Sequence, residues 1–354
     1  MEVATQGSQG HDRMRVARDL ADLDTVMVLR VSDYGTMGLR GSESVNDSRS
    51  PLSALTRGAG ISANDGARGG SFGIGSAVGP MASAMCTVFY TSLPDDGPDV
   101  VFAGYSRLAS HRDGNGVWRG GEGFFTDLDT EDFRYLRNPT PFGPFPKRTE
   151  PGTDLYVVGY RKADEDPDLR NIRDAFVDNF MMAVHRGGLE VRGKGLTEVW
   201  ELTSETLERF ALERTEARAF YRAIHDPAPV ERATEHVGHV RLYINVDPTL
   251  RRTLGTITMR KPLMKIDTFR HTSIPAKYAA VLVCADPRGN SLLRDLEPPE
   301  HTMWDPARAT GGTAAIRELK EFVRAALRER VSDRIGDTVE IKGSRSSSPR
   351  RRSR

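Results

Sequence analysis

The chain has 354 residues, 50 of them basic and 49 acidic, so its formal charge of +1 gives no global reason to bind nucleic acid, a membrane surface or an acidic partner. Its length is enough for two domains with separate cores. The two cysteines, Cys86 and Cys284, lie in apolar runs, which favours a reducing cytoplasm over a disulfide framework. The longest apolar stretch, Tyr278 to Ala285, is too short to cross a bilayer, so we expect no membrane contact.

The first elements predict a helix, a strand and then a long loop. After a polar start, His11 to Leu23 has apolar residues along one side of a helix. Thr25 to Ser32 is rich in β-branched residues and ends at the turn-forming sequence DYGTMG, which places Asp33 at the edge of a sheet. Ser42 to Gly70 is crowded with Gly, Ser, Asn and Asp, and we expect a long functional loop there.

The remaining pattern mixes strands and helices and predicts an α+β fold. A small-residue helix, Ser76 to Met85, leads into three strands, and the helix Ile172 to His185 ends at Gly187-Gly188. The three strands are Cys86–Ser92, Val100–Tyr105 and Thr153–Tyr160. Further on we expect a helical stretch at Ser204–Ile224, strands at Leu189–Arg192, Val240–Val246 and Tyr278–Ala285, and an amphipathic helix at Ile316–Val331.

These elements suggest four segments. Residues 1–24 are a disordered start with a short helix, and 25–194 and 195–335 are two folded domains that meet near Lys194. Residues 336–354 form a basic tail without apolar residues, which we expect to be disordered. The tail could touch phosphate backbones non-specifically, or it could only aid solubility.

The densest motif is the glycine-rich segment Gly66 to Gly79, GARGGSFGIGSAVG, which is compatible with several chemistries. Gly70 to Ser76 nearly matches a phosphate-binding loop, but Ser76 occupies the place of the essential lysine. Gly69 to Gly73 matches a nucleophile elbow with Ser71 as nucleophile, yet no strand precedes it. A dinucleotide-binding loop would need another glycine spacing, and a flexible loop before a packed helix is the plainest interpretation.

The neighbourhood of Asp33 favours an adenine nucleotide. Asp33 follows a buried strand, and the glycine-rich loop comes about thirty residues later and runs into a helix. A buried carboxylate at a strand end can accept a hydrogen bond from the exocyclic amine of adenine, and such a buried acceptor discriminates strongly against bases without that donor. The loop would offer backbone N–H groups and the positive end of a helix dipole to the phosphates. Asp33 alone could also be an ordinary turn residue.

These residues resemble the GHKL ATPase superfamily of gyrase, chaperones, histidine kinases and MutL, whose Bergerat-type fold is a mixed sheet covered by helices. The strings VLRVSDYGTMGL, GGSFGIGSA, CTVFYTS, DNFMMAVHRGGLEV and LLRDLEPPEHTMWDP are similar to bacterial ATP-binding proteins related to the MORC and MutL branch, from Val28 to Pro306. The resemblance implies that residues 25–194 bind ATP with Mg²⁺, that 195–335 form a transducer-like domain, and that the protein dimerises with itself. It assigns nucleotide contacts to Asp33, Gly35, Gly38, Gly69, Gly70, Ser71, Phe72, Gly73, Ile74, Gly75, Ser76 and Thr153.

The sequence departs from that superfamily in two places. Its members carry a general-base Glu and a magnesium-binding Asn on a helix well upstream of the Asp motif, whereas only 32 residues precede Asp33 and Met1 to Leu23 contains no Glu-x-x-x-Asn. We therefore expect an N-terminally truncated chain, or a helix supplied by another chain, and assign no catalytic or metal residue. The chain would be an ATPase if the true gene product carries that helix. Ser76 also replaces a lysine found in close relatives, which removes a phosphate contact.

Three motifs lie in the second half. Arg260-Lys261-Pro262 with Lys265 could be the phosphate-sensing loop of a transducer domain, or a solvated basic hairpin. His236-x-x-His239 has metal-like spacing without a nearby acidic or Cys partner, and we interpret it as structural or exposed. A third motif is similar to a family signature, and its residue pattern alone does not indicate a role. It consists of Glu297-Pro298-Pro299-Glu300-His301, with Trp304.

Three functions follow. The first is an ATP-gated switch that closes as a homodimer on a partner, either DNA or a protein, as in repair or phage-defence machines. The second is a degenerate interaction module that no longer handles nucleotide. The third is a serine hydrolase that uses Ser71.

Overall fold

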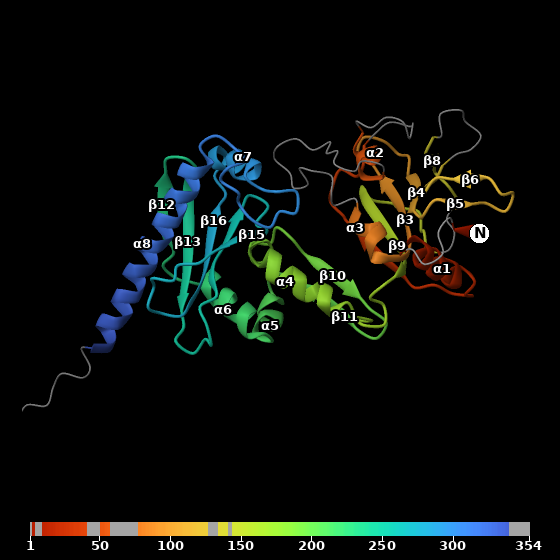
Figure 1. The fold of residues 1–354 in the computed structure, drawn as a ribbon. Helices are drawn as coiled ribbons and strands as arrows, with labels where there is room; N and C mark the ends of the chain where they lie inside the picture. The colour runs from red at the N-terminus through yellow and green to blue at the C-terminus, as the bar shows by residue number, and fades with distance from the viewer. Residues whose placement is uncertain are drawn as a thin grey trace, which may run out of the picture. The chain divides into compact units, whose positions relative to one another are not determined.

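The computed structural model describes residues 2–3, 9–40, 50–56, 77–126, 134–140 and 144–339. The chain divides into two compact units, Met1–Pro167 and Asp168–Arg354. Each unit contains a β-sheet with helices packed on it (Figure 1), so the predicted α+β class is confirmed. None of the described helices is long and apolar enough to span a lipid bilayer.

The main sheet of the first unit contains six strands. Its order is β2 (Val28–Ser32), β9 (Gly152–Tyr160), β3 (Ser83–Leu93), β4 (Val101–Arg107) and β7 (Glu122–Phe125), and β8 (Leu136–Arg137) also pairs with β4. A mixed sheet was expected here, but every described pairing in this sheet is antiparallel. The other elements are β1 (Glu2–Val3), α1 (Gln9–Ala21), α2 (Pro51–Thr56), α3 (Val78–Ala82), β5 (His111–Arg112) and β6 (Trp118–Arg119).

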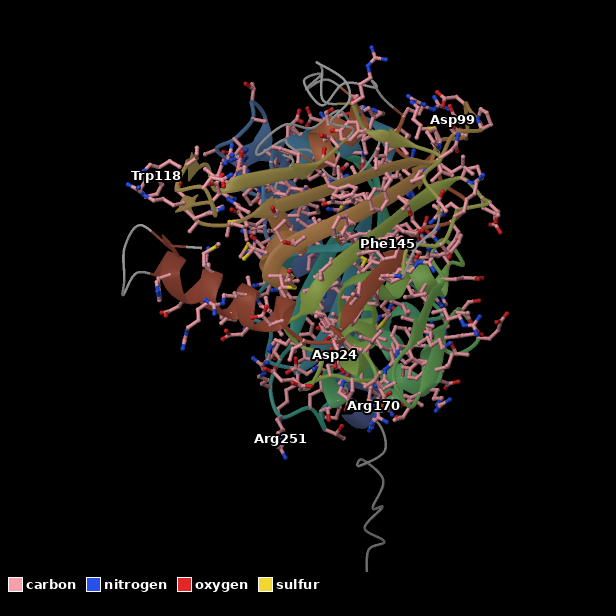
Figure 2. All side chains as sticks on the ribbon, turned by 90° about the vertical axis from the view of Figure 1, so that its right-hand side faces the viewer. Asp24, Asp99, Trp118, Phe145, Arg170 and Arg251 are labelled. Atoms are coloured by element: carbon pink, nitrogen blue, oxygen red, sulfur yellow. The ribbon has the colours of Figure 1, made fainter. Side chains whose placement is uncertain are left out.

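Successive side chains along β3 and β9 point to opposite faces of this sheet. Val88 pairs with Val157 on one face, and Phe89 pairs with Tyr156 on the other. On the second face, the Phe145 ring lies 4.6 Å from the Tyr156 ring and 5.0 Å from the Phe89 ring, between centroids. Figure 2 shows Phe145 over the strands, with Trp118 and Asp99 at opposite ends of this unit. The aromatic and β-branched residues that predict these strands therefore also form their packing.

Two local predictions need correction in the first unit. The expected loop from Ser42 to Gly70 contains the helix α2, where Leu52 is buried and the hydroxyls of Ser53 and Thr56 lie 3.2 and 2.8 Å from the Tyr135 hydroxyl. The helix expected over Ser76–Met85 is limited to α3, because β3 already begins at Ser83. A bulge allows this early start, since Cys86 has a φ of 49° and the pairing with β9 shifts register there.

The second unit contains a five-stranded mixed sheet. Its order is β12 (Val230–Thr234), β13 (Gly238–Val246), β16 (Tyr278–Cys284), β14 (Gly255–Arg260) and β15 (Lys265–Phe269), in which only β14 and β16 are parallel. The remaining elements are α4 (Arg170–His185), β10 (Val191–Lys194), β11 (Val199–Leu202), α5 (Leu207–Leu212), α6 (Thr215–Ile224), α7 (Pro287–Asp295) and α8 (Gly312–Val339).

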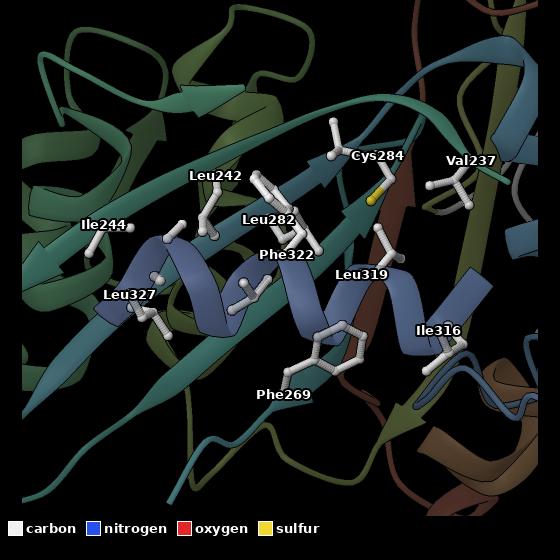
Figure 3. Packing of buried hydrophobic residues seen from close by; sticks show 14 of the residues in the cluster. Val237, Leu242, Ile244, Phe269, Leu282, Cys284, Ile316, Leu319, Phe322 and Leu327 are labelled. Carbon is white, nitrogen blue, oxygen red and sulfur yellow. The ribbon is translucent and has the colours of Figure 1, made fainter. Parts of the chain in front are cut away.

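The amphipathic helix predicted over Ile316–Val331 is confirmed as part of α8. Its apolar stripe packs on one face of the sheet, where Leu319 and Phe322 lie against Leu282 and Cys284 (Figure 3). This is the spacing that puts one helix face on a core. Cys284 and Cys86 are both buried free thiols, and burial raises the pKa of Cys284 well above its ordinary value.

The division between the units lies upstream of the expected boundary near Lys194. Helix α4 packs into the second unit, where Val177 and Met181 share a core with Ile257 and Val281 of the sheet. The apolar face of α4 needs that sheet to be buried, so the helix cannot belong to the first unit. The helix stop at Gly187 is confirmed, because Gly187 has a φ of +67° and its N–H donates to the Val184 carbonyl at 2.9 Å.

Candidate functional site

The structure brings Asp33 and Thr153 together at the end of the β2 and β9 pair. Asp33 directly follows β2, and Thr153 is the second residue of β9, which runs antiparallel to it. The Asp33 N–H donates to the Thr153 carbonyl at 3.0 Å, and the Thr153 N–H donates to Asp33 Oδ1. Asp33 is exposed, and both of its carboxylate oxygens accept hydrogen bonds, Oδ1 from the Thr153 N–H and Oδ2 from the Thr36 hydroxyl. The predicted position of a carboxylate at the end of a strand matches this geometry. The predicted burial is wrong, because Asp33 is exposed and no residue of the edge strand β2 is buried.

The turn after Asp33 depends on its two glycines. Thr36 donates its hydroxyl to Asp33 Oδ2 at 2.9 Å and accepts the Gly38 N–H at 3.4 Å. Gly35 and Gly38 have φ of +66° and +63°, a conformation that other residues rarely adopt. A Cβ on Gly38 would also overlap the Leu93 carbonyl oxygen, so the backbone approaches β3 closely there. Both glycines therefore shape the turn that holds the Asp33 carboxylate.

Ser92 joins this turn to β9 and was not singled out from the sequence. Its hydroxyl accepts the Leu39 N–H at 2.8 Å and lies 3.1 Å from the Gly152 carbonyl and 3.1 Å from the Thr153 hydroxyl. Ser92 is itself fully buried at the end of β3. A hydroxyl at the end of the apolar run CTVFYTS is the signal that could have identified it.

Beneath Asp33 lies a buried ionic cluster that sequence reasoning also missed. Asp154 is fully buried, and its Oδ1 lies 2.6 Å from Arg148 Nη1 and 3.1 Å from Arg30 Nη2. Its Oδ2 accepts the Thr91 hydroxyl at 3.0 Å. Burial alone would raise the pKa of Asp154, but hydrogen bonds from the Ser32 and Thr91 hydroxyls and the charges of the two arginines outweigh it and hold the pKa below its ordinary value.

The predicted glycine lid is the second half of the proposed nucleotide site. Gly69, Gly70, Ser71, Phe72, Gly73, Ile74, Gly75 and Ser76 all lie outside the described residues. The helix that follows them, α3, has 5 residues. The predicted contribution of the helix dipole and of the lid N–H groups to phosphate binding stays a prediction.

The prediction of a phosphate-sensing loop is wrong for Arg260. Its side chain is 1% exposed, and its Nε and Nη2 lie 2.5 and 3.0 Å from the two carboxylate oxygens of the fully buried Glu297. His301 Nδ1 lies 2.6 Å from Glu297 Oε2. The motif that begins at Glu297 therefore has a structural role, because it neutralises an arginine inside the second unit. Lys265 instead lines a cleft of about 530 Å³ with Phe176 and His301.

The two histidines of the metal-like motif have separate acidic partners, which corrects the expectation that no acidic residue lies near them. His236 Nδ1 lies 3.0 Å from Glu318, and His239 Nε2 lies 3.1 Å from Glu231. Among the described residues, no group of three or more His, Cys, Asp and Glu could hold a metal ion.

No protein-family model matches the chain, and no curated protein matches its sequence. Solved structures similar to it include the B subunit of DNA gyrase from Myxococcus xanthus, at 14% identity and a TM-score of 0.40 over 86% of this chain and 84% of that one. The ATPase region of topoisomerase II from Saccharomyces cerevisiae has 10% identity and a TM-score of 0.39 over 78% and 72%. An Aquifex aeolicus MutL ATPase domain has 11% identity and a TM-score of 0.29 over 78% and 88%. Values this low assign neither a family nor a function to the chain.

Proposed function

We propose that this chain is an ATP-binding protein of the GHKL type that acts as a nucleotide-gated switch. The proposal is carried by the contact between Asp33 and Thr153, which leaves an exposed carboxylate in a fixed orientation at a strand end. Two positive-φ glycines, Gly35 and Gly38, shape the adjoining turn. The N–H of an exocyclic amine is the donor that such an acceptor selects, and adenine carries one at its 6-position.

The glycine-rich segment would contact the phosphates. Four of the eight residues in 69–76 are glycines, which leave room for phosphate beside the backbone, and short runs of backbone N–H groups can bind phosphate without a lysine. This explains how Ser76 is compatible with nucleotide binding. Thr153 would touch the adenine side of the pocket through its hydroxyl, which already contacts Ser92.

Binding without rapid hydrolysis fits the described helix best. Helix α1 carries neither the Glu nor the Asn that members of the superfamily use to activate water and to hold Mg²⁺. The described residues contain no group of three or more His, Cys, Asp and Glu that could hold a metal ion, and we assign no residue to Mg²⁺. Nucleotide would then act by ordering the lid and favouring a homodimer that closes on DNA or a partner protein in the cytoplasm, in a repair or defence role.

Isothermal titration with ATP, ADP and a non-hydrolysable analogue tests the proposal. We expect wild-type protein to bind all three, and Asp33→Asn to weaken ATP binding by about tenfold or more, because the loss of a hydrogen bond to a charged group costs about 1.5–3 kcal/mol. Asp113→Asn is the matched control, since Asp113 also accepts backbone N–H groups in a turn of the same unit.

A silent titration with folded wild-type protein would remove the proposal in favour of an interaction module. Labelling of Ser71 by a fluorophosphonate probe would instead support the hydrolase.

A further inference from the structure

We propose that Arg148, anchored by Asp154, is a positioning residue that orients Asp33 and thereby sets the preference of the site for purines with a 6-amino group. This inference rests on the proposed function. Arg148 lies in the loop before β9, outside every motif of the sequence analysis, and it need not touch the nucleotide.

Arg148 connects the buried cluster to the backbone of Asp33. Its Nη1 donates to Asp154 Oδ1 at 2.6 Å, and its Nη2 donates to the Asp33 carbonyl at 2.6 Å. Its Nε donates to the Glu150 carbonyl at 3.3 Å. The side chain is 2% exposed. A planar guanidinium with three fixed partners transmits the position of one to the others, which a flexible ammonium group cannot do.

The same guanidinium supports the residue after Asp33. It lies 5.0 Å from the ring centroid of Tyr34, a cation–π distance, although Tyr34 is 58% exposed. The peptide between Asp33 and Tyr34 is therefore held at its carbonyl and by the adjacent ring. Arg148 fixes the direction in which the strand β2 continues into the turn.

The charges of the cluster explain why Asp154 is the anchor. Asp154 is fully buried and is shared by Arg148 and Arg30, so two positive charges adjoin one buried negative charge. The Arg30 side chain is 40% exposed, so water also solvates its charge. A buried arginine is stable only with such partners, which makes the position of Arg148 well defined.

Gly152 provides the space for this arrangement. Its φ is +141°, and a Cβ there would overlap the Asp33 carbonyl oxygen and press on Arg148 Nη2. The glycine thus allows the Asp33 carbonyl, the guanidinium and the start of β9 to meet.

The consequence for selectivity follows from hydrogen-bond polarity. An ionised carboxylate can only accept hydrogen bonds, so a well-oriented Asp33 favours the 6-amino group of adenine and disfavours the 6-oxo group of hypoxanthine. If Arg148 is removed, the Asp33 carbonyl loses its buried donor, so the backbone of the turn can shift and move the exposed carboxylate out of its fixed orientation. Affinity for ATP should fall, whereas affinity for ITP, which never gained from the carboxylate, should change little.

The test measures dissociation constants for ATP and ITP by titration calorimetry with full-length wild-type, Arg148→Met and Arg148→Lys proteins. We expect the wild type to prefer ATP by at least about tenfold, as for one hydrogen bond to a charged group. In both variants the ratio should fall to within about threefold of one, through weaker ATP binding. Arg119→Met is the matched control, because Arg119 forms an exposed pair with Asp113 in the same unit.

Each outcome decides between the inferences. An unchanged ratio of the ATP and ITP dissociation constants in a folded Arg148 variant, including an equal loss of affinity for both nucleotides, overturns the positioning role. The proposed function of the wild type, nucleotide binding, would still stand. If the wild type binds ATP and ITP with equal affinity, the positioning role is also overturned, whereas nucleotide binding is not. A wild type that binds neither nucleotide overturns both this inference and the proposed function. If Arg148→Met does not fold, the Lys variant, which keeps the charge but not the fork, gives the decision.

Discussion

Arg260 and Glu297 form an ion pair in the interior of the second unit, with side chains that are 1% and 0% exposed. The pair joins the end of β14 to the loop after α7. A buried pair of this kind is worth little against a well-packed apolar pair, but the loss of one partner leaves the other charge without compensation. The contribution of this pair to the free energy of unfolding is therefore tested by replacing one partner at a time.

We expect Glu297→Gln to destabilise the second unit by about 3–5 kcal/mol, because the amide keeps the shape but not the charge that Arg260 needs. Urea unfolding followed by circular dichroism gives the value. Glu231→Gln is the control, since its partner Arg241 is 42% exposed and exposed pairs contribute about 0–1 kcal/mol. Equal effects of the two substitutions would contradict the prediction.

The stability of the second unit should fall as the pH is lowered from about 7 to 5, in part because of His185. Burial, with the positive charges of His225 and Arg186 nearby, lowers the pKa of His185 in the folded protein. The unfolded chain therefore takes up this proton at higher pH than the folded one, which favours unfolding in acid. His185→Gln should flatten the dependence of the melting temperature on pH, and His239→Gln, on an exposed site, serves for comparison. Parallel curves for wild type and His185→Gln would contradict this assignment.

Gly152→Ala should lower the melting temperature of the first unit by several degrees, since backbone strain costs about 1–3 kcal/mol and the new methyl group meets the Asp33 carbonyl. Gly97→Ala is the control, because its added Cβ has no neighbour within 4 Å and its φ is not positive. Differential scanning calorimetry compares them. A Gly152→Ala protein as stable as the control would show that the approach of the Asp33 carbonyl can relax at little cost.

Leu319→Ala should destabilise the second unit by about 2–5 kcal/mol, because it leaves a cavity under α8 where Leu319 is fully buried. Arg317→Ala, two residues earlier on the exposed face, should have a small effect. Denaturant unfolding at a single pH separates the two. A Leu319→Ala effect below about 1 kcal/mol would mean that the helix can repack without that side chain.

The place of Asp33 at the end of a strand and the strand that contains Thr153 could be predicted, because the patterns of β2 and β9 are local and regular, but their pairing could not. Arg148 could not be predicted in the same way. It lies in a Pro-rich loop without periodicity, and its contact with the Asp33 carbonyl joins residues 115 positions apart. Only the completed sheet brings these two positions together.

Arg260 shows how charge misleads local interpretation. Its neighbours Lys261 and Lys265 indicate a basic hairpin, yet all six residues of β14 are buried, including Arg260 at its end. Its partner Glu297 lies 37 residues later in the sequence, and only the fold shows that the two side chains are in contact. The boundary near Lys194 failed for a related reason, because the spacing of apolar residues in α4 predicts a buried face but not which sheet buries it.

The two buried thiols make the protein suited to a direct test of nucleotide-driven motion. Cys86 and Cys284 are the only cysteines in the sequence, and both are enclosed by their strands. Maleimide dyes should therefore react first with cysteines introduced on exposed surfaces, one in each unit, while the native pair is left in place. Energy transfer between two such dyes would follow the separation of the units as ATP is added, molecule by molecule.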